Sequence, residues 1–168
     1  MSDKPRPELP ADYAPAIGEL VIAIGRLDSV LVDLMRIFSK TTLIVAVTSY
    51  SHLQTSSKID TLLALYHLGS SDDEIKLGDG FTKMMSKARG LCDFRNSVVH
   101  CLWSVDEDGT AHAARFSARG KLVRTRVPVS ASEIRKKAGE VYALEERLRG
   151  LRDHLNAQAI QTSEALEV

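Results

Sequence analysis

Residues 17–38, with the sequence IGELVIAIGRLDSVLVDLMRIF, decide the fold class of this chain. Their apolar side chains recur at intervals of three and four, the spacing of a helix that buries one stripe. Such a helix is stable when its stripe packs against other elements, so further helices with the same spacing are expected in the chain. The positions that set the period are Leu20, Val21, Ile24, Leu27, Leu31, Leu34, Met35 and Phe38.

Two more helices are predicted in the following part of the chain. Ser57 and Asp60 resemble a helix-start box, and Gly69 supplies a stop after the apolar residues that follow them. The next helix is expected from about 81 to about 101. The short apolar run at 43–47 could extend the first helix, start another or form a strand, because periodicity does not distinguish these at such a length.

The last predicted helix opens at Ser130, which forms a second capping box with Glu133 directly after Pro128. From Val141 on, apolar residues alternate at three and four, the spacing of a heptad seam. Packing of this seam within the chain's own bundle is favoured over a separate coiled-coil dimer, because the seam is short. The seam consists of Val141, Leu144, Leu148, Leu151 and Leu155.

The hydrophobic period changes at about 102–128. Asp108-Gly109 and Arg119-Gly120 are turn signals. The stretches that flank them alternate as strands do, with Val123, Thr125 and Val127 on one side and Leu122, Arg124 and Arg126 on the other. We expect a small antiparallel β-hairpin or meander there, inserted before the last long helix. The expected fold is therefore mainly α, a bundle of four to five helices with this insert.

The domain organisation follows from the prolines and from the ends of the helical pattern. Four prolines fall within 1–15, which predicts a disordered arm. We expect a single helical domain at 16–157 and a frayed tail at 158–168.

Composition limits what the chain can bind. Its 168 residues suit one domain, and 44% apolar with 26% charged residues is ordinary for a globular protein. Lys+Arg and Asp+Glu both number 22, so there is no global positive field for non-specific nucleic-acid binding. A contact with RNA would be local, at the basic stretch Arg115, Arg119, Lys121, Arg124, Arg126, Arg135, Lys136 and Lys137.

We expect a cytoplasmic, reducing environment for the chain. It has neither a signal-peptide pattern nor an apolar run of membrane-spanning length. Its two cysteines, Cys92 and Cys101, lie in one predicted helix on nearly opposite sides, which argues against a disulfide.

The helix at 81–101 carries the candidate functional residues. At about 100° per residue, Arg89, Asp93 and Asn96 fall near His100 in one polar stripe, whereas Arg95 falls in the apolar stripe. A buried arginine needs a partner, since an unpaired buried charge costs several kcal/mol. The open alternatives are an acid such as Asp33 or Glu145, a group of carbonyls, a subunit seam or a bound phosphate.

Arg95-Asn96, three residues and then His100 resemble the signature of the HEPN family of helical domains that act on nucleic acids. Leu102-Trp103 and the segment 57–63 are similar to parts of some bacterial members, and the resemblance covers about 17–155. Cys101 departs from the glycine that many relatives carry after the histidine. The resemblance implies a metal-independent endoribonuclease that works as a homodimer, with the two motifs facing each other at a seam.

The residue types suit RNA cleavage by attack of a ribose 2′-hydroxyl on the adjacent phosphate. His100 can move a proton near neutral pH, and Arg95 can stabilise the crowded phosphorane. Asn96 could orient the imidazole or hold a phosphate oxygen. We expect no cofactor and no metal, because the remaining histidines lack the spacing of a zinc site. These histidines are His52, His67, His112 and His154.

Further phosphate or RNA contacts are expected from basic residues around this motif. Trp103 and Phe116 could stack on bases, but apolar docking of the hairpin on the bundle is the favoured use. A regulated nuclease of this kind would serve as a toxin or a defence effector, with an antitoxin or regulatory protein as a partner. The expected contacts are Arg89, Arg115, Arg119, Lys121 and Arg124.

One alternative from a different class stays open. The same domain could be a non-catalytic module that binds a nucleotide, RNA or a partner protein, with Arg95 and His100 kept for packing or phosphate contact. The neutral net charge favours this alternative, and the basic stretch favours the nuclease. That basic stretch could also be a solvated hairpin face that guards a sheet edge.

Overall fold

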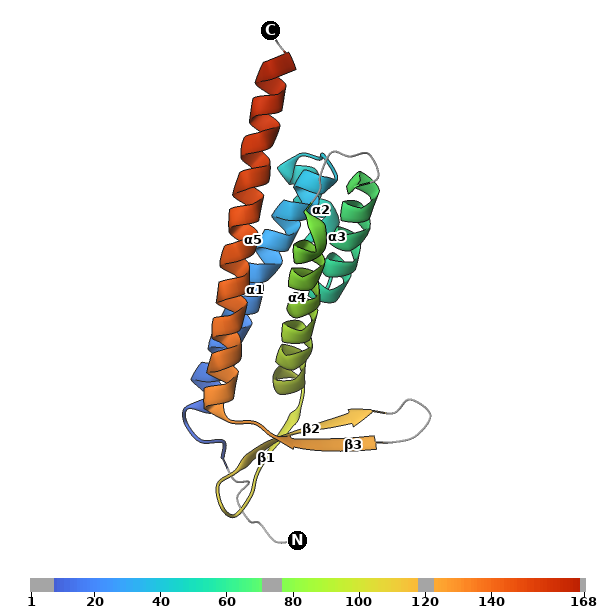
Figure 1. The fold of residues 1–168 in the computed structure, drawn as a ribbon. Helices are drawn as coiled ribbons and strands as arrows, with labels where there is room; N and C mark the ends of the chain where they lie inside the picture. The colour runs from blue at the N-terminus through green and yellow to red at the C-terminus, as the bar shows by residue number, and fades with distance from the viewer. Residues whose placement is uncertain (1–7, 71–76, 118–122, 167–168) are drawn as a thin grey trace.

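A computed structural model of the chain describes residues 8–70, 77–117 and 123–166, and within them the expected fold class is confirmed (Figure 1). Helices α1 to α4 come first, a three-stranded antiparallel sheet follows, and the long helix α5 closes the chain. Figure 1 shows the sheet at one end of the bundle. The elements are α1 (Tyr13–Phe38), α2 (Leu43–Tyr50), α3 (Thr55–Ser70), α4 (Gly78–Val99), β1 (Leu102–Val105), β2 (Ala111–Ser117), β3 (Val123–Pro128) and α5 (Ala131–Leu166).

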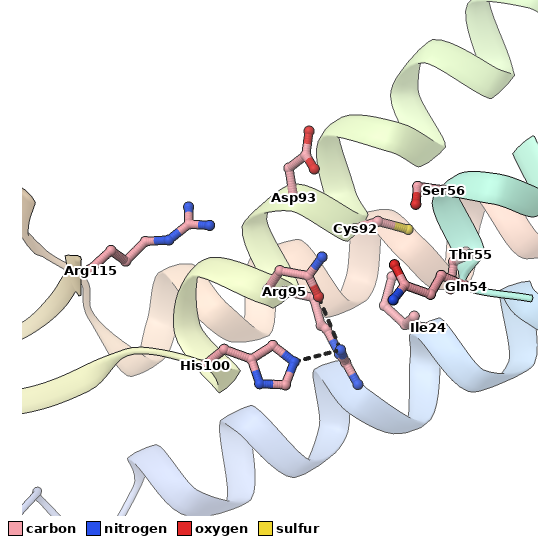
Figure 2. Close-up of a pocket in the computed structure, with 10 residues that line it drawn as sticks. Ile24, Gln54, Thr55, Ser56, Cys92, Asp93, Arg95, His100 and Arg115 are labelled. Carbon is pink, nitrogen blue, oxygen red and sulfur yellow. Dashed lines mark hydrogen bonds between the residues drawn. The ribbon is translucent and has the colours of Figure 1, made fainter. Parts of the chain in front are cut away.

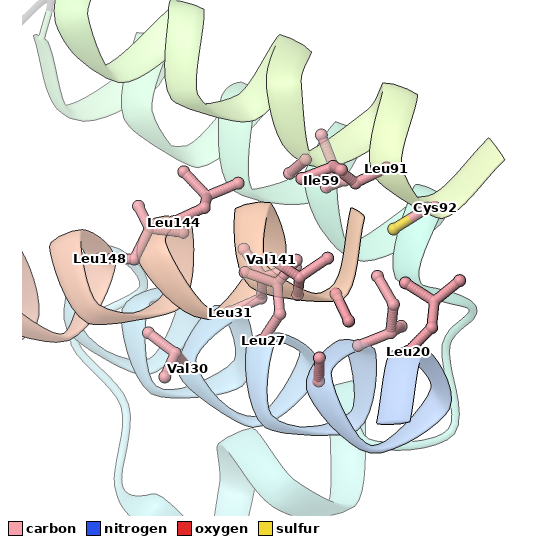
Figure 3. Packing of buried hydrophobic residues seen from close by; sticks show 14 of the residues in the cluster. Leu20, Leu27, Val30, Leu31, Ile59, Leu91, Cys92, Val141, Leu144 and Leu148 are labelled. Carbon is pink, nitrogen blue, oxygen red and sulfur yellow. The ribbon is translucent and has the colours of Figure 1, made fainter. Parts of the chain in front are cut away.

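The core lies mainly between α1 and α5, which pack side by side (Figure 3). On α5 the heptad positions Val141, Leu144 and Leu148 are buried, and on α1 they are met by residues such as Leu27 and Leu31. The seam therefore packs within the chain's own bundle, as predicted. The side-chain hydroxyl of Ser130 accepts a 3.1 Å hydrogen bond from the backbone N–H of Glu133, so the predicted cap forms. Helix α5 continues to Leu166, through most of the segment expected to fray.

The ambiguous run at 43–47 forms the helix α2. Its N-cap is Thr42, whose side chain accepts a 3.4 Å hydrogen bond from the backbone N–H of Val45. Within this helix only Ala46 is buried. Its exposed apolar side chains are Leu43, Ile44, Val45 and Val47.

Part of the expected arm at 1–15 is instead built into the domain. Helix α1 begins at Tyr13, and Pro15 fits because the first turn of a helix has unpaired N–H groups to spare. The buried Tyr13 hydroxyl donates a 2.9 Å hydrogen bond to the carbonyl of Val129, and Leu9 packs against the core. The expectation of disorder is therefore wrong for the end of this segment, because Tyr13 has a buried partner; residues 1–7 lie outside the described chain.

The sheet has the order β1-β2-β3 and docks on the bundle. The turn predicted at Asp108-Gly109 joins β1 to β2, with Gly109 at φ +84°, whereas the one predicted at Arg119-Gly120 lies outside the described residues. The indole N–H of Trp103 donates a 3.0 Å hydrogen bond to the carbonyl of Val98, and its ring meets the Tyr13 ring edge-on. Trp103 therefore serves docking, as predicted.

Two smaller expectations can also be checked. Cys92 and Cys101 are both free, as their placement on the predicted helix indicated. In the described parts of the chain, no helix combines the length and the apolar character needed to cross a bilayer.

Candidate functional site

Helix α4 ends one residue before His100, and this end shapes the site. His100 is the C-cap, with φ −105° and ψ 24°, and its backbone N–H donates a 3.2 Å hydrogen bond to the carbonyl of Asn96. The predicted helix end at about 101 is too late, and a helical position for His100 would direct its side chain to a different face from Arg95. Departure from helical dihedrals turns the imidazole toward Arg95 in the preceding turn (Figure 2).

Arg95 contacts both other residues of the motif. Its Nη1 donates a 3.0 Å hydrogen bond to Oδ1 of Asn96 and lies 3.4 Å from Nε2 of His100. The expectation that Arg95 and His100 project from different faces is therefore wrong. One chain brings the guanidinium and the imidazole together without a second copy.

The acids proposed as partners for Arg95 are engaged elsewhere. Asp33 accepts a 3.0 Å hydrogen bond from Arg152, and Glu145 pairs with Arg26 and Arg149. Arg95 is half-buried, and its Nε is buried without a hydrogen-bond partner among the described residues. The guanidinium therefore keeps donor capacity that this chain does not use.

The contact between Arg95 and His100 also fixes roles on the imidazole. A guanidinium can only donate, so Nε2 of His100 must be the acceptor. In a neutral imidazole the proton then sits on Nδ1, an assignment that follows from the network. Nε2 consequently carries the lone pair on the side that faces Arg95.

A pocket of about 540 Å³ opens beside this cluster, within the size range of about 300–1,000 Å³ typical of small-molecule sites. Four elements contribute to it: α1, the start of α3, the end of α4, and β2 (Figure 2). The pocket brings together four of the predicted site residues, Arg95, Asn96, His100 and Arg115. Its complete lining is Ile24, Gln54, Thr55, Ser56, Cys92, Asp93, Arg95, Asn96, His100 and Arg115.

Arg115 reaches the pocket because of its register in the sheet. Ala111 and Ala113 on the same strand belong to the buried core, and alternation places Arg115 on that same face of β2. It is exposed, and it forms no hydrogen bond or ion pair with any described residue. An arginine without a protein partner at the edge of a pocket is suited to an anion.

The remaining predicted contacts do not join this pocket. Arg89 donates a hydrogen bond to the carboxylate of Asp60 on α3, and this bond raises the pKa of Arg89 above its ordinary value. Its phosphate contact stays a prediction, and Arg89 lies outside the pocket lining. Helix α3 begins at Thr55, earlier than the predicted start at Ser57. Asp60 therefore lies inside the helix and pairs with Arg89. Arg119 and Lys121 lie outside the described residues.

Arg124 is placed only by its register, opposite Phe116 in the ladder between β2 and β3. Three other members of the basic stretch form ion pairs: Arg126 with Asp106, Arg135 with Asp12, and Lys137 with Glu140. Much of the described basic stretch is thus paired on the surface, and Arg115 is the member that lines the pocket.

Sequence reasoning missed the wall formed by Gln54, Thr55 and Ser56. In the sequence these are ordinary polar residues before a helix, and only the packing of α3 beside α4 brings them to the site. It also missed Cys92 as part of the pocket. Burial is the main cause that raises the pKa of the Cys92 thiol to about 11, so the thiol is neutral at physiological pH.

Within the described residues no three His, Cys, Asp or Glu side chains are grouped so that they could hold a metal ion. Comparisons of the chain with known protein families, with curated proteins and with solved structures find no match. The site is therefore interpreted from its own geometry and chemistry.

Proposed function

We propose that this protein is a HEPN-like endoribonuclease that cleaves RNA without a metal ion at the pocket beside Arg95 and His100. One observation carries the proposal: Arg95, Asn96 and His100 are in mutual contact at a pocket that a further arginine, Arg115, also lines. A cation and a proton-transfer group side by side are what phosphodiester cleavage by a neighbouring hydroxyl requires.

The proposed reaction begins when the ribose 2′-hydroxyl takes the place of Nη1 of Arg95 beside Nε2 of His100 and gives its proton to that nitrogen. The 2′-oxygen then forms a bond to phosphorus, and the bond from phosphorus to the 5′-oxygen breaks. The leaving oxygen takes a proton, so the products are a 2′,3′-cyclic phosphate and a 5′-hydroxyl. Arg95 donates from its guanidinium to the non-bridging oxygens of the phosphorane.

Asn96 and Arg115 have supporting roles in this proposal. Oδ1 of Asn96 accepts from Arg95 and thereby holds the guanidinium beside the imidazole. Arg115 lies on the other side of the end of α4 (Figure 2) and binds a neighbouring phosphate of the same strand. The pocket lining carries two arginines against one acid, Asp93, so an anion is favoured there.

A homodimer remains part of the proposal. One imidazole that has just accepted a proton can return it, but a concerted reaction needs a separate acid for the leaving oxygen. The His100 side chain of a second copy would supply that acid. Arg95 and His100 already meet within one chain, so their contact gives no reason for a second copy. The dimer is supported by the need for two proton-transfer groups, one that accepts a proton and one that donates a proton.

The test is an RNA digest in EDTA with the wild type, Arg95→Ala and His100→Ala, scored for 2′,3′-cyclic phosphate ends. Arg147→Ala and His154→Ala are matched controls, because both residues are exposed on α5 and lie outside the pocket lining. We expect losses of about 10²-fold or more for the two site variants and none for the controls. Cleavage that survives either site substitution would overturn the assigned roles. An absence of cleavage on every RNA would favour the non-catalytic binding module.

A further inference from the structure

The pocket has two chemically different ends, and the proposed cleavage uses only one of them. Arg95, His100 and Arg115 form the cationic end, which a phosphate would occupy. At the start of α3, the side chains of Gln54, Thr55 and Ser56 form a second wall (Figure 2). These three side chains carry no charge, so they give no reason for a second phosphate to bind there.

The surface near this wall is also uncharged. Ile24 of α1 and Cys92 of α4 belong to the lining, and Cys92 is only 5% exposed. Its thiol stays protonated at neutral pH, because burial raises the pKa to about 11. A ligand part that lies here meets apolar atoms and neutral hydrogen-bonding groups.

A nucleobase has this combination of properties: it is neutral and flat, with donors and acceptors along its edge. Gln54 offers an amide that can donate and accept at once, and the hydroxyls of Thr55 and Ser56 can do either. None of the ten described lining residues is Phe, Tyr or Trp, and the one aromatic ring, His100, belongs to the cationic end, so recognition at this wall would rest on hydrogen bonds. Hydrogen bonds to base edges distinguish one base from another, whereas stacking tolerates any base.

We infer that Gln54, Thr55 and Ser56 form a nucleobase subsite that selects the base beside the cleaved phosphate. The inference rests on the proposed function for the position of that phosphate. It assigns the substrate as an unpaired nucleotide, because a base within a duplex has its edge engaged and stacked and does not enter the pocket.

Gln54 is the residue to change, because its side chain is exposed and does not take part in the hydrogen bond that its backbone makes. The backbone carbonyl of Gln54 accepts a 3.0 Å hydrogen bond from the N–H of Lys58, which Gln54→Ala preserves. Ser56→Ala is a second variant in the same wall. Gln158→Ala is the matched control, since it removes the same side chain from α5, outside the pocket lining.

The first experiment sequences the cleavage sites in a random single-stranded RNA pool. We expect the wild type and Gln158→Ala to share a base preference at one position beside the cleaved bond. Gln54→Ala should reduce that preference about fivefold, the effect of one hydrogen bond of about 1 kcal/mol. A preference that is unchanged in both Gln54→Ala and Ser56→Ala overturns the inference, and so does a wild type without preference.

The second experiment separates failure of the subsite from failure of the nuclease. The four nucleoside 3′-monophosphates are titrated into the wild type and Gln54→Ala by calorimetry, which needs no cleavage. If RNA is never cut, a wild type that prefers one base by about fivefold, with the preference lost in Gln54→Ala, still supports the subsite. Equal affinities for all four nucleotides overturn it.

Discussion

The ion pair between Lys58 and Asp28 offers the sharpest test of how the start of α3 is held. Lys58 is the large buried cation of the described chain, with 1% of its side chain exposed, whereas Asp28 on α1 is 29% exposed. The ammonium also donates a 3.2 Å hydrogen bond to the carbonyl of Ser51. Since Gln54 lies one turn before Lys58, this pair fixes the neutral wall of the pocket against α1.

The two partners should respond differently to removal. Asp28→Asn keeps the shape but leaves a buried ammonium without its counter-charge, and breaking a fully buried pair in this way costs about 3–5 kcal/mol. Because water can reach Asp28, we expect a smaller loss of about 2 kcal/mol. Lys58→Met removes the buried ammonium and leaves the carboxylate of Asp28, whose side chain is 29% exposed although its Oδ1 is buried, so we expect a loss of about 1 kcal/mol.

The assay is urea unfolding followed by circular dichroism, with the free energy of unfolding extrapolated to water. The double variant Asp28→Asn/Lys58→Met should be about as stable as Lys58→Met alone, since no uncompensated ammonium remains. Asp33→Asn is the matched control on α1: its partner Arg152 is 24% exposed, and the loss should be about 0.5 kcal/mol. Equal losses for Asp28→Asn and Lys58→Met, or additive losses in the double variant, would refute the reasoning.

Two further stability predictions follow from buried groups. Because the folded pKa of the Cys92 thiol is raised to about 11, above its unfolded value, the stability held by the neutral thiol is complete below about pH 8.5 and is lost as the pH rises toward 11. Urea unfolding at about pH 8 and about pH 11 should therefore show a decline about 2 kcal/mol larger for the wild type than for Cys92→Ala; parallel declines would contradict it. Tyr13→Phe should cost about 1 kcal/mol by the same assay, because it removes the buried 2.9 Å hydrogen bond to the carbonyl of Val129. An unchanged unfolding midpoint would show that this bond does not contribute.

The fold class was predictable because local sequence carries its two main signals. The apolar spacing in α1 and α5 and the change of period after α4 place helices and a sheet without knowledge of their packing. The run at 43–47 stayed ambiguous because α2 is only eight residues long, too short for a clear periodic pattern. Its N-cap hydrogen bond depends on the single side chain of Thr42. At the N-terminus, the prolines predicted disorder, but the hydrogen bond from Tyr13 to Val129 joins residues 116 positions apart and has no local signal.

Part of the site was also predictable from local sequence, and part was not. The motif Arg95, Asn96 and His100 stands in the sequence, and the structure places its three side chains together. The projection of His100 was wrong, because a helical wheel assumes dihedrals that the C-cap abandons. Arg115 could not be separated from its basic neighbours without the register of β2, and Gln54 gave no signal at all.

What the sequence by itself determined is what depends on near neighbours: the helical periods, the cap at Ser130, the insert before α5 and the residue types of the motif. What only the tertiary structure decided is which distant side chains share a space. The pocket joins residues from α1, α3, α4 and β2, and their meeting depends on packing and register across the whole domain. Side-chain chemistry is local, whereas a binding site is made by contacts between segments far apart in the chain.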